Sequence, residues 1–269
     1  MILYIQTPAI PRSKLHETGV IKALKFLDTC NHFSEIRWFI NIDLVKSSLY
    51  EFEDYNITID NFKRCEENLN KTKMYIETSD KPCFYLAFRN LTKKIQLDVK
   101  KENLNADDYC VMWLEDDWYM KDNDGFHRLM DTFLNNDELL VAALYHYKIN
   151  MGGNPDIIKG EVFQLFDGVN FDVDNKRDPE QIRKYDVFKK YIWIDPWPKH
   201  NISFHDKLTH INTSSEKMGI TDAHEVNTKI ISSDVIEDVG DDWKVDKLQK
   251  TWSYGEKDGI HSDRSYTYK

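Results

Sequence analysis

Three consecutive carboxylates follow an apolar run in the middle of the sequence. Glu115, Asp116 and Asp117 come directly after YCVMWL at 109–114, a segment with the β-branched and aromatic composition of a buried strand. Adjacent carboxylates repel one another, so stability alone does not favour three of them at the end of a core strand. A solvated acidic turn is the alternative interpretation. Because clustered carboxylate oxygens suit Mg²⁺ or Mn²⁺ together with a phosphorylated ligand, we favour a metal site.

The elements that would position this triplet alternate between strand and helix. Strands are expected at 2–7, 36–43, 74–78, 109–114 and 138–147, and helices at 16–30, 61–70, 81–100 and 125–134. This alternation predicts an α/β fold with a mostly parallel sheet and flanking helices, because each parallel connection needs a crossover. Ligands of such sheets bind beyond the carboxyl ends of the strands. The acid triplet, Thr7 and Asp43 would therefore line one crevice.

The pattern changes after residue 150. The segment MGGNPD at 151–156 is expected to be a turn and 157–166 an amphipathic helix. DPEQIRKY at 178–185 is expected to open another helix, with proline in its first turn. We expect residues 151–269 to form a second lobe of the same domain, packed on the edge of the sheet with loops facing the crevice.

Composition narrows the classes of partner and compartment. The net charge is −10 and the basic residues form no long run, which disfavours nucleic acid and anionic membranes as partners. The four cysteines include no C-x-x-C pair, so reduced, buried thiols are expected. The opening segment MILYIQTP lacks a basic region, and no segment approaches membrane-spanning length. We therefore expect a soluble, cytoplasmic protein without a transmembrane segment.

Three short motifs, in order along the chain, resemble those of nucleotide-sugar-dependent glycosyltransferases of the GT-A fold, especially family 2-like enzymes. LEDDW at 114–118 resembles their Asp-x-Asp element, and AFRN at 87–90 resembles the Ala-Arg-Asn on their preceding helix. GGNPDIIKGEVFQLF at 152–166 resembles their Gly-rich acceptor loop and following helix. The resemblance covers about residues 1–190, and the style of the sequence suggests a viral or phage-type member.

The resemblance implies a division of labour in the sequence. Residues 1–150 would be the donor-binding α/β half, and residues 151–269 the acceptor-side and C-terminal lobe. Asp117 would bind the Mn²⁺ or Mg²⁺ that bridges the donor diphosphate. Glu115 or Asp116 would meet the ribose or the metal's water, and Glu115 is also a candidate metal ligand. Glu115 departs from the commoner Asp of the family, which leaves the direct ligand open.

Further roles are carried over residue by residue. Thr7 and Asp43, at the ends of the first two strands, would contact the nucleoside, and Arg89 would lie on the donor side of the crevice. A strand-end threonine, a turn aspartate and a surface ion pair are equally good interpretations of these three residues. C-terminal histidines complete the metal site of some family members, but no spacing in this sequence singles one out.

An inverting transfer also needs a general base that deprotonates the acceptor hydroxyl. Family 2 enzymes keep this base in an acidic pair after the Gly-rich loop, which Asp178 and Glu180 resemble. The alternative is that Asp178 caps a helix and Glu180 complements its dipole. Asp238, in the acidic turn IEDVGDDW, is a rival base.

The function that these residues predict is a metal-dependent hexosyl- or pentosyltransferase, with a nucleoside-diphosphate sugar as donor and a glycan or other hydroxyl as acceptor. A nucleotidyltransferase or sugar-phosphate pyrophosphorylase shares the crevice and the carboxylates. It is expected to carry a Gly-rich loop after the first strand, where this chain has TPAIPRSKLHETG. A non-catalytic carbohydrate-binding protein is the third possibility, although the alternating first half argues against its usual β-sandwich.

Overall fold

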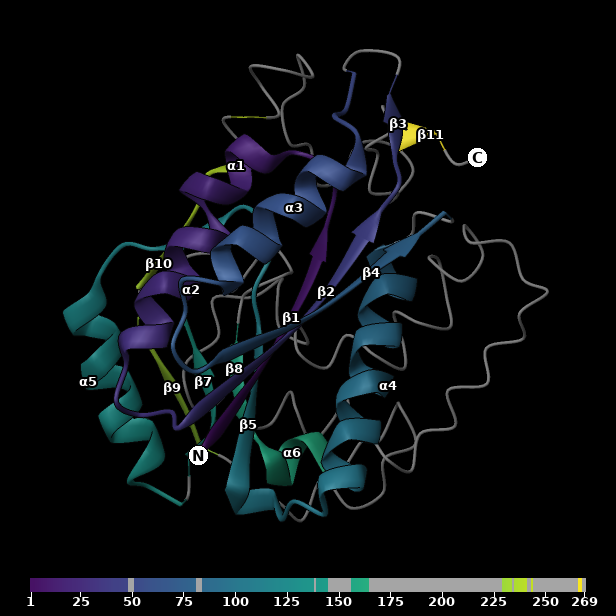
Figure 1. Cartoon of the computed structure of the whole chain (residues 1–269). Helices are drawn as coiled ribbons and strands as arrows, with labels where there is room; N and C mark the ends of the chain where they lie inside the picture. The colour runs from purple at the N-terminus through teal and green to yellow at the C-terminus, as the bar shows by residue number, and fades with distance from the viewer. Residues whose placement is uncertain are drawn as a thin grey trace, which may run out of the picture.

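The structure, a computed structural model, describes residues 1–47, 51–80, 84–137, 139–144, 156–164, 229–233, 235–240, 243 and 266–267. At its centre is a seven-stranded sheet with the order β4-β2-β1-β5-β8-β7-β9 (Figure 1). Its strands are β1 Ile2–Ala9, β2 Glu35–Asp43, β4 Thr72–Ser79, β5 Tyr109–Trp113, β7 Leu139–Ala143, β8 Asp156–Lys159 and β9 Lys229–Ser232.

Strand direction confirms the predicted fold class. β4, β2, β1 and β5 pair in parallel, and so do β7 and β9. Within the described sheet, β8 is the strand that runs against its neighbours β5 and β7. The protein is therefore α/β with a mostly parallel sheet. Because β8 and β9 come after residue 150, both halves of the sequence build this one sheet.

Helices cover both faces of the sheet. α4 and α6 lie on one side of it, and α2, α3 and α5 lie on the other (Figure 1). The helices are α1 Ser13–Thr18, α2 Val20–Thr29, α3 Tyr55–Glu66, α4 Phe84–Glu102, α5 Asn123–Leu134 and α6 Gly160–Gln164, with a short 3₁₀ turn η1 at Ala106–Asp108. Two small ladders pair β6 Trp118–Met120 with β10 Ile236–Asp238, and β3 Lys46–Ser47 with β11 Tyr266–Thr267.

Local sequence explains where several helices begin and end. The side chain of Asp54 accepts a hydrogen bond from the backbone of Asn56 at the start of α3, and Asp122 does the same for Gly125 at the start of α5. α4 is followed by Asn103 with φ of 53°, a left-handed conformation that asparagine tolerates after a helix. These caps satisfy backbone groups that a helix end leaves without intrahelical partners.

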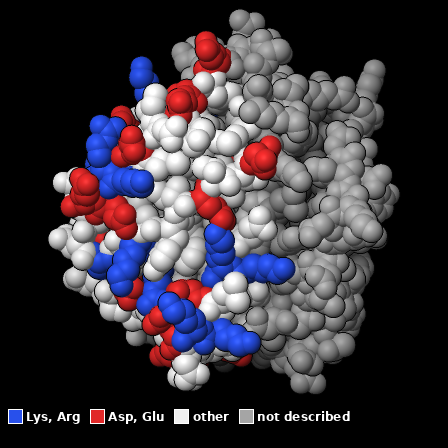
Figure 2. Space-filling model, turned by 45° about the vertical axis from the view of Figure 1, so that its right-hand side comes forward, with Lys and Arg blue, Asp and Glu red and all other residues white. Residues whose placement is uncertain are grey.

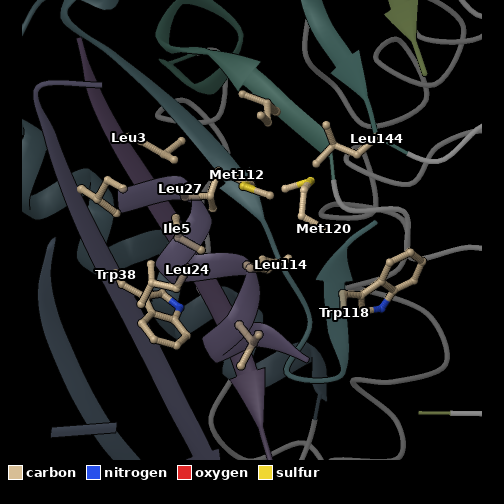
Figure 3. Packing of buried hydrophobic residues seen from close by; sticks show 14 of the residues in the cluster. Leu3, Ile5, Leu24, Leu27, Trp38, Met112, Leu114, Trp118, Met120 and Leu144 are labelled. Atoms are coloured by element: carbon tan, nitrogen blue, oxygen red, sulfur yellow. The ribbon is translucent and has the colours of Figure 1, made fainter. Parts of the chain in front are cut away.

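The hydrophobic core lies between the sheet and α2. Val20, Leu24 and Leu27 are fully buried and recur at helical spacing on one face of α2. Figure 3 shows Leu24 and Leu27 against Ile5 of β1 and near Met112 of β5. β5 is buried along its whole length and β1 along nearly all of it, as expected for central strands covered on both faces.

Three predicted elements differ from the structure. The helix expected at 16–30 is two helices, α1 and α2, divided at Gly19. The helix expected at 61–70 is α3, which begins and ends earlier. The helix expected at 157–166 begins as the strand β8 and becomes helical only at Gly160. Ile157 and Ile158 pair there with residues of β5 and β7, so this β-branched pair fills the gap between two strands. Tertiary pairing overrides the helical periodicity of this segment.

Charged side chains are mixed on the described surface. Figure 2 shows acidic and basic side chains interspersed over the described part of one face. None of the helices in the described ranges has both the length and the apolar character needed to cross a membrane.

The packing of α2 predicts the effect of a cavity there. Leu24→Ala should lower the free energy of unfolding by about 2–5 kcal/mol, because it removes buried methyl groups from a fully enclosed position. The neighbouring exposed residue offers a matched control, and Lys25→Ala should change this free energy by less than about 0.5 kcal/mol. Urea unfolding of the two variants measures the difference, and equal values would contradict the described packing.

Candidate active site

The candidate site lies where the strand order of the sheet reverses. From β1 the chain proceeds outward to β2 and β4, and it then returns to the other side of β1 as β5. In open α/β sheets, ligands bind outside the carboxyl ends of the strands at such a switch point. β1 and β5 stay paired up to Gln6 and Trp113, so the residues that follow each strand emerge side by side.

A buried ion pair joins the two emerging segments. Arg12, after β1, donates from Nε to Oδ2 of Asp116 at 3.1 Å and from its terminal nitrogen to Oδ1 at 2.5 Å. The backbone of Ile10 and Nε2 of His16 lie 3.2 and 2.9 Å from the same Oδ2 atom. Arg12 is 7% exposed, Asp116 4% and His16 0%. Burial would raise the pKa of Asp116, but the adjacent guanidinium and the imidazole hold it well below its usual range.

Asp117 shares the same arginine and is enclosed by a segment from the end of the chain. Its Oδ2 accepts a hydrogen bond from Arg12 at 2.9 Å, and its backbone oxygen accepts one from Val239 at 3.0 Å. At Gly240, a Cβ would lie 1.9 Å from Oδ2 of Asp117, so only glycine allows this approach. Gly19, the residue before α2, also lies close to the backbone of Asp116 and Asp117.

Glu115 is the most open member of the triplet. It is partly exposed, whereas Asp116 and Asp117 are buried. Its Oε1 lies 3.5 Å from Nε1 of Trp113 on the preceding strand. Two of the three carboxylates therefore contact Arg12 inside the protein, and Glu115 is the most exposed of the three.

Aromatic and polar side chains surround Arg12. The Trp243 ring centroid lies 5.1 Å from its guanidinium carbon, and Phe52 packs against Trp243 at 6.2 Å between ring centroids. Glu53 accepts hydrogen bonds from the backbone and hydroxyl of Ser13 at the start of α1. The loop before α3 and the side chain of Trp243 thus both lie against the start of α1.

The two predicted nucleoside contacts on the strands are buried, Thr7 in β1 and Asp43 at the end of β2. Thr7 is fully buried and its Oγ1 accepts a hydrogen bond from Nε1 of Trp38 at 2.7 Å. Asp43 is 6% exposed and accepts a hydrogen bond from Asn41 at 2.7 Å. Arg89 lies in the N-terminal part of α4, and the structure does not describe its side chain.

The three predicted bases fall in different parts of the chain. Asp238 ends β10, pairs in register with Trp118 and accepts a hydrogen bond from Gly240 at 2.7 Å, which brings it next to the acid triplet. Asp178 and Glu180 lie outside the described residues. Sequence patterns did not reveal Arg12, His16 or Gly240, although a cation directly after the first strand is a usable signal once that strand is known to adjoin the triplet.

The acid triplet fits a hard divalent cation only in part. Carboxylate oxygens are the correct donors for Mg²⁺ or Mn²⁺. Within the described ranges, Arg12 offsets one of the three negative charges of the triplet. Asp116 already accepts hydrogen bonds from two side chains and one backbone group. Among the residues that the structure describes, no group of three or more His, Cys, Asp or Glu side chains has metal-binding geometry. Asp116 is therefore the member of the triplet least suited to bind a cation.

Comparison with known proteins gives distant structural likenesses. No protein family model and no curated protein matches the sequence. A cytidylyltransferase from Leptospira borgpetersenii is 10% identical, with a TM-score of 0.42, over 98% of this chain and 91% of that one. A mannosyltransferase from Pyrobaculum calidifontis, solved with GDP-mannose and Mn²⁺, is 10% identical with a TM-score of 0.47. The match covers 87% of this chain and 54% of the mannosyltransferase, so this chain spans about half of that protein.

A third similar structure is glucosyl-3-phosphoglycerate synthase from Mycobacterium tuberculosis, solved with Mn²⁺, uridine diphosphate and glucosyl-3-phosphoglycerate. It is 9% identical with a TM-score of 0.42, over 88% of this chain and 71% of that one.

Because the ion pair is buried, removing Arg12 should lower the free energy of unfolding by an amount that depends on pH. Arg12→Met should lower the free energy of unfolding by about 3–5 kcal/mol at pH 7, because Asp116 and Asp117 stay buried without their cation. In the native protein the folded pKa of Asp116 is lowered, so its contribution is complete above the unfolded value near pH 4 and is lost as pH falls below it. In the variant, Asp116 keeps His16 but loses the guanidinium, so its folded pKa is higher than in the native protein and the folded form loses less stability as pH falls.

The difference in the free energy of unfolding between the native protein and Arg12→Met should therefore become smaller from pH 7 toward pH 4. Urea unfolding at several pH values measures it. Arg128→Met is the matched control, because the Arg128 side chain is 72% exposed and pairs at 3.7 Å with Asp122. Its cost should be small and independent of pH. An equally small cost for Arg12→Met at pH 7 would show that the buried pair does not hold the site together.

Proposed function

We propose that this protein is a glycosyltransferase of the GT-A type, similar to family 2 enzymes. In this proposal it moves a hexosyl or pentosyl group from a nucleoside-diphosphate sugar to an acceptor hydroxyl. One observation carries the proposal: the acid triplet lies at the switch point between β1 and β5, where α/β sheets bind their ligands.

The charge distribution at the switch point supports a donor diphosphate with a divalent cation. Two of the three carboxylates face Arg12 inside the protein, and Glu115 is left partly exposed. An exposed carboxylate alone would repel a diphosphate. A cation between them reverses the sign of the interaction. We propose that Glu115 and Asp117 hold Mn²⁺ or Mg²⁺, which would stabilise the negative charge on the departing nucleoside diphosphate.

The remaining residues of the site take supporting roles in this proposal. Asp116 positions the site, because its carboxylate ties the turn after β5 to Arg12 and His16. Thr7 and Asp43 shape the floor of the nucleoside pocket, and Arg89 contributes from the donor side. The aromatic side chain of Trp243, next to Arg12, is suited to stack on a ring of the ligand.

The transfer itself needs a proton acceptor near the acceptor hydroxyl. In an inverting reaction a carboxylate takes the hydroxyl proton while the hydroxyl oxygen bonds to the anomeric carbon. The bond from that carbon to the diphosphate oxygen breaks at the same time. The proximity of Asp238 to the acid triplet supports it as this base, and Asp178 and Glu180 remain the alternatives from the sequence.

Nucleotide binding tests the proposal directly. UDP or GDP should bind with at least about tenfold higher affinity in Mn²⁺ than in EDTA, as measured by calorimetry, because a bridging cation is needed beside Glu115. Glu115→Gln should remove this difference while leaving the free energy of unfolding within about 0.5 kcal/mol of the native value. Asp124→Asn, an exposed acid in α5, is the control and should keep the metal effect. Equal affinities in Mn²⁺ and EDTA for the native protein would refute the metal bridge.

Product analysis separates the proposed reaction from nucleotidyl transfer. A glycosyltransferase releases a nucleoside diphosphate from a nucleotide sugar, whereas a nucleotidyltransferase or pyrophosphorylase forms or consumes pyrophosphate. Turnover that yields pyrophosphate would indicate a nucleotidyltransferase or pyrophosphorylase instead. Binding of sugars without any turnover would indicate a non-catalytic carbohydrate-binding protein.

Single substitutions identify the base. Asp238→Asn should lower kcat by ~10²–10⁴-fold with donor affinity almost unchanged, because the residue acts on the acceptor and not on the nucleotide. Asp178→Asn and Glu180→Gln serve as the competing variants in the same assay. If one of these two produces the loss and Asp238→Asn does not, the base belongs to the acidic pair and not to the late turn.

A further inference from the structure

β4 is an edge strand of the described sheet. Among the described residues, it pairs with β2 alone. The backbone oxygen of Lys71 accepts a hydrogen bond from Ile36 of β2, and that of Ser79 accepts one from Leu44, the residue after β2. The backbone N–H and C=O groups of the odd-numbered residues of β4 therefore point toward β2. The backbone of Met74 instead donates to the side chain of Glu66 at 2.7 Å, away from β2. The outward ladder groups of β4 are therefore those of its even-numbered residues.

These outward groups are largely available for pairing. In the described part of the chain, the backbone groups of Ile76 and Thr78 that face outward have no hydrogen-bond partner. Thr78 is exposed, and Met74 and Ile76 are half-buried at the margin of the core. An exposed edge with free donors and acceptors is a template for a further strand.

The sequence of this edge is complementary to itself. Residues 72–78 read TKMYIET. When two copies run antiparallel about Tyr75, Lys73 of one lies opposite Glu77 of the other, and Met74 lies opposite Ile76. The threonines at 72 and 78 also face each other. Opposite charges directly across an antiparallel pair stabilise it, and like charges destabilise it.

Exposed apolar side chains occur on β4 and on the two helices that flank it. Among the described residues, the large hydrophobic side chains that are most exposed are Tyr55 at 38%, Ile57 at 51%, Tyr75 at 41% and Leu97 at 66%. Tyr75 belongs to β4, and the others to α3 and α4, the helices on its two sides. Leu97 lies one turn after Lys94, which contacts Glu77 of β4, so it is on the strand's side of α4.

We propose that this edge is the interface of a homodimer, in which the β4 strands of two copies pair antiparallel about Tyr75. The ladder geometry agrees with this centre. Tyr75 turns its backbone toward β2, so the two tyrosines form the non-hydrogen-bonded pair and stack at the two-fold axis beside Phe39, whose ring lies 4.5 Å from that of Tyr75. Met74 and Ile76 of opposite copies then exchange both backbone hydrogen bonds.

Pairing of two β4 strands requires several side-chain contacts within each copy to break, and these contacts are weak. Lys73 pairs with Glu35 at 3.1 Å, and Glu77 pairs with Lys94, both at partly exposed positions that solvent screens. Glu66 occupies the backbone donor of Met74, so it competes directly with the second copy. The dimer is therefore concentration-dependent.

Sedimentation equilibrium of the full chain over a range of concentrations tests the proposal. The native protein should form a dimer, and Lys73→Glu or Glu77→Lys alone should weaken it by about tenfold or more, since each sets two like-charged pairs across the axis. The double variant Lys73→Glu with Glu77→Lys restores opposite charges and should recover most of the affinity. This recovery is the readout that a purely structural role of either residue does not produce.

Two controls make the outcome decisive. Arg128→Glu reverses a positive charge at an exposed position of α5, which packs against β7 and β9 at the other end of the sheet, and should leave the dimer unchanged. Glu66→Ala removes the competing acceptor and should tighten the dimer. Circular dichroism confirms that each variant is folded. A native protein that stays monomeric throughout, or a double variant no tighter than the single ones, would overturn the proposal.

Discussion

The ion pair between Arg12 and Asp116 is the interaction on which the rest of the site depends. It is almost completely buried, and a buried charge is tolerated only when it is paired and hydrogen-bonded. The pair joins the segment after β1 to the segment after β5, two strands that are neighbours in space and about 100 residues apart along the chain. Once these segments are fixed to each other, the entry of α1 and the turn of the acid triplet are fixed as well.

The ion pair with Arg12 gives the three carboxylates of the acid triplet different surroundings. Three adjacent carboxylates with identical surroundings would repel one another and bind protons. Here Asp116 and Asp117 share Arg12, and Glu115 stays at the surface of the crevice. The protein thus keeps the buried Asp116 ionised, because Arg12 and His16 lower its pKa against the effect of burial.

Apolar patterning was enough to predict most of the sheet. β5 is a continuous hydrophobic run, which is how a central parallel strand appears in a sequence, and β1 and β2 contain shorter apolar runs. Each of the three was expected within two residues of its described bounds. The acid triplet was identifiable for the same reason, because it interrupts such a run. β8 was mistaken for the start of a helix, since its isoleucines continue into the apolar spacing of α6.

The partners of the triplet could not be predicted because they act at long range. A single Arg12 after two prolines forms no local pattern, and its meaning depends on which strand lies beside β1. Gly240 is required because Asp117 approaches it so closely, a contact between residues more than 120 positions apart. Pairings of this kind are set by topology, whereas periodicity reports only on the few residues that share one helix or strand face.

The close fit of Gly240 against Asp117 has a consequence for the order of events during synthesis. β1, β2, β4 and β5 are complete once Trp113 has been made, and they can associate as soon as they leave the ribosome. β9, β10 and Gly240 follow only after more than a hundred further residues. A nascent chain therefore passes through a stage with a formed sheet half and an uncovered acidic turn. The acidic turn is therefore enclosed late in synthesis, when β10 and Gly240 pack against it.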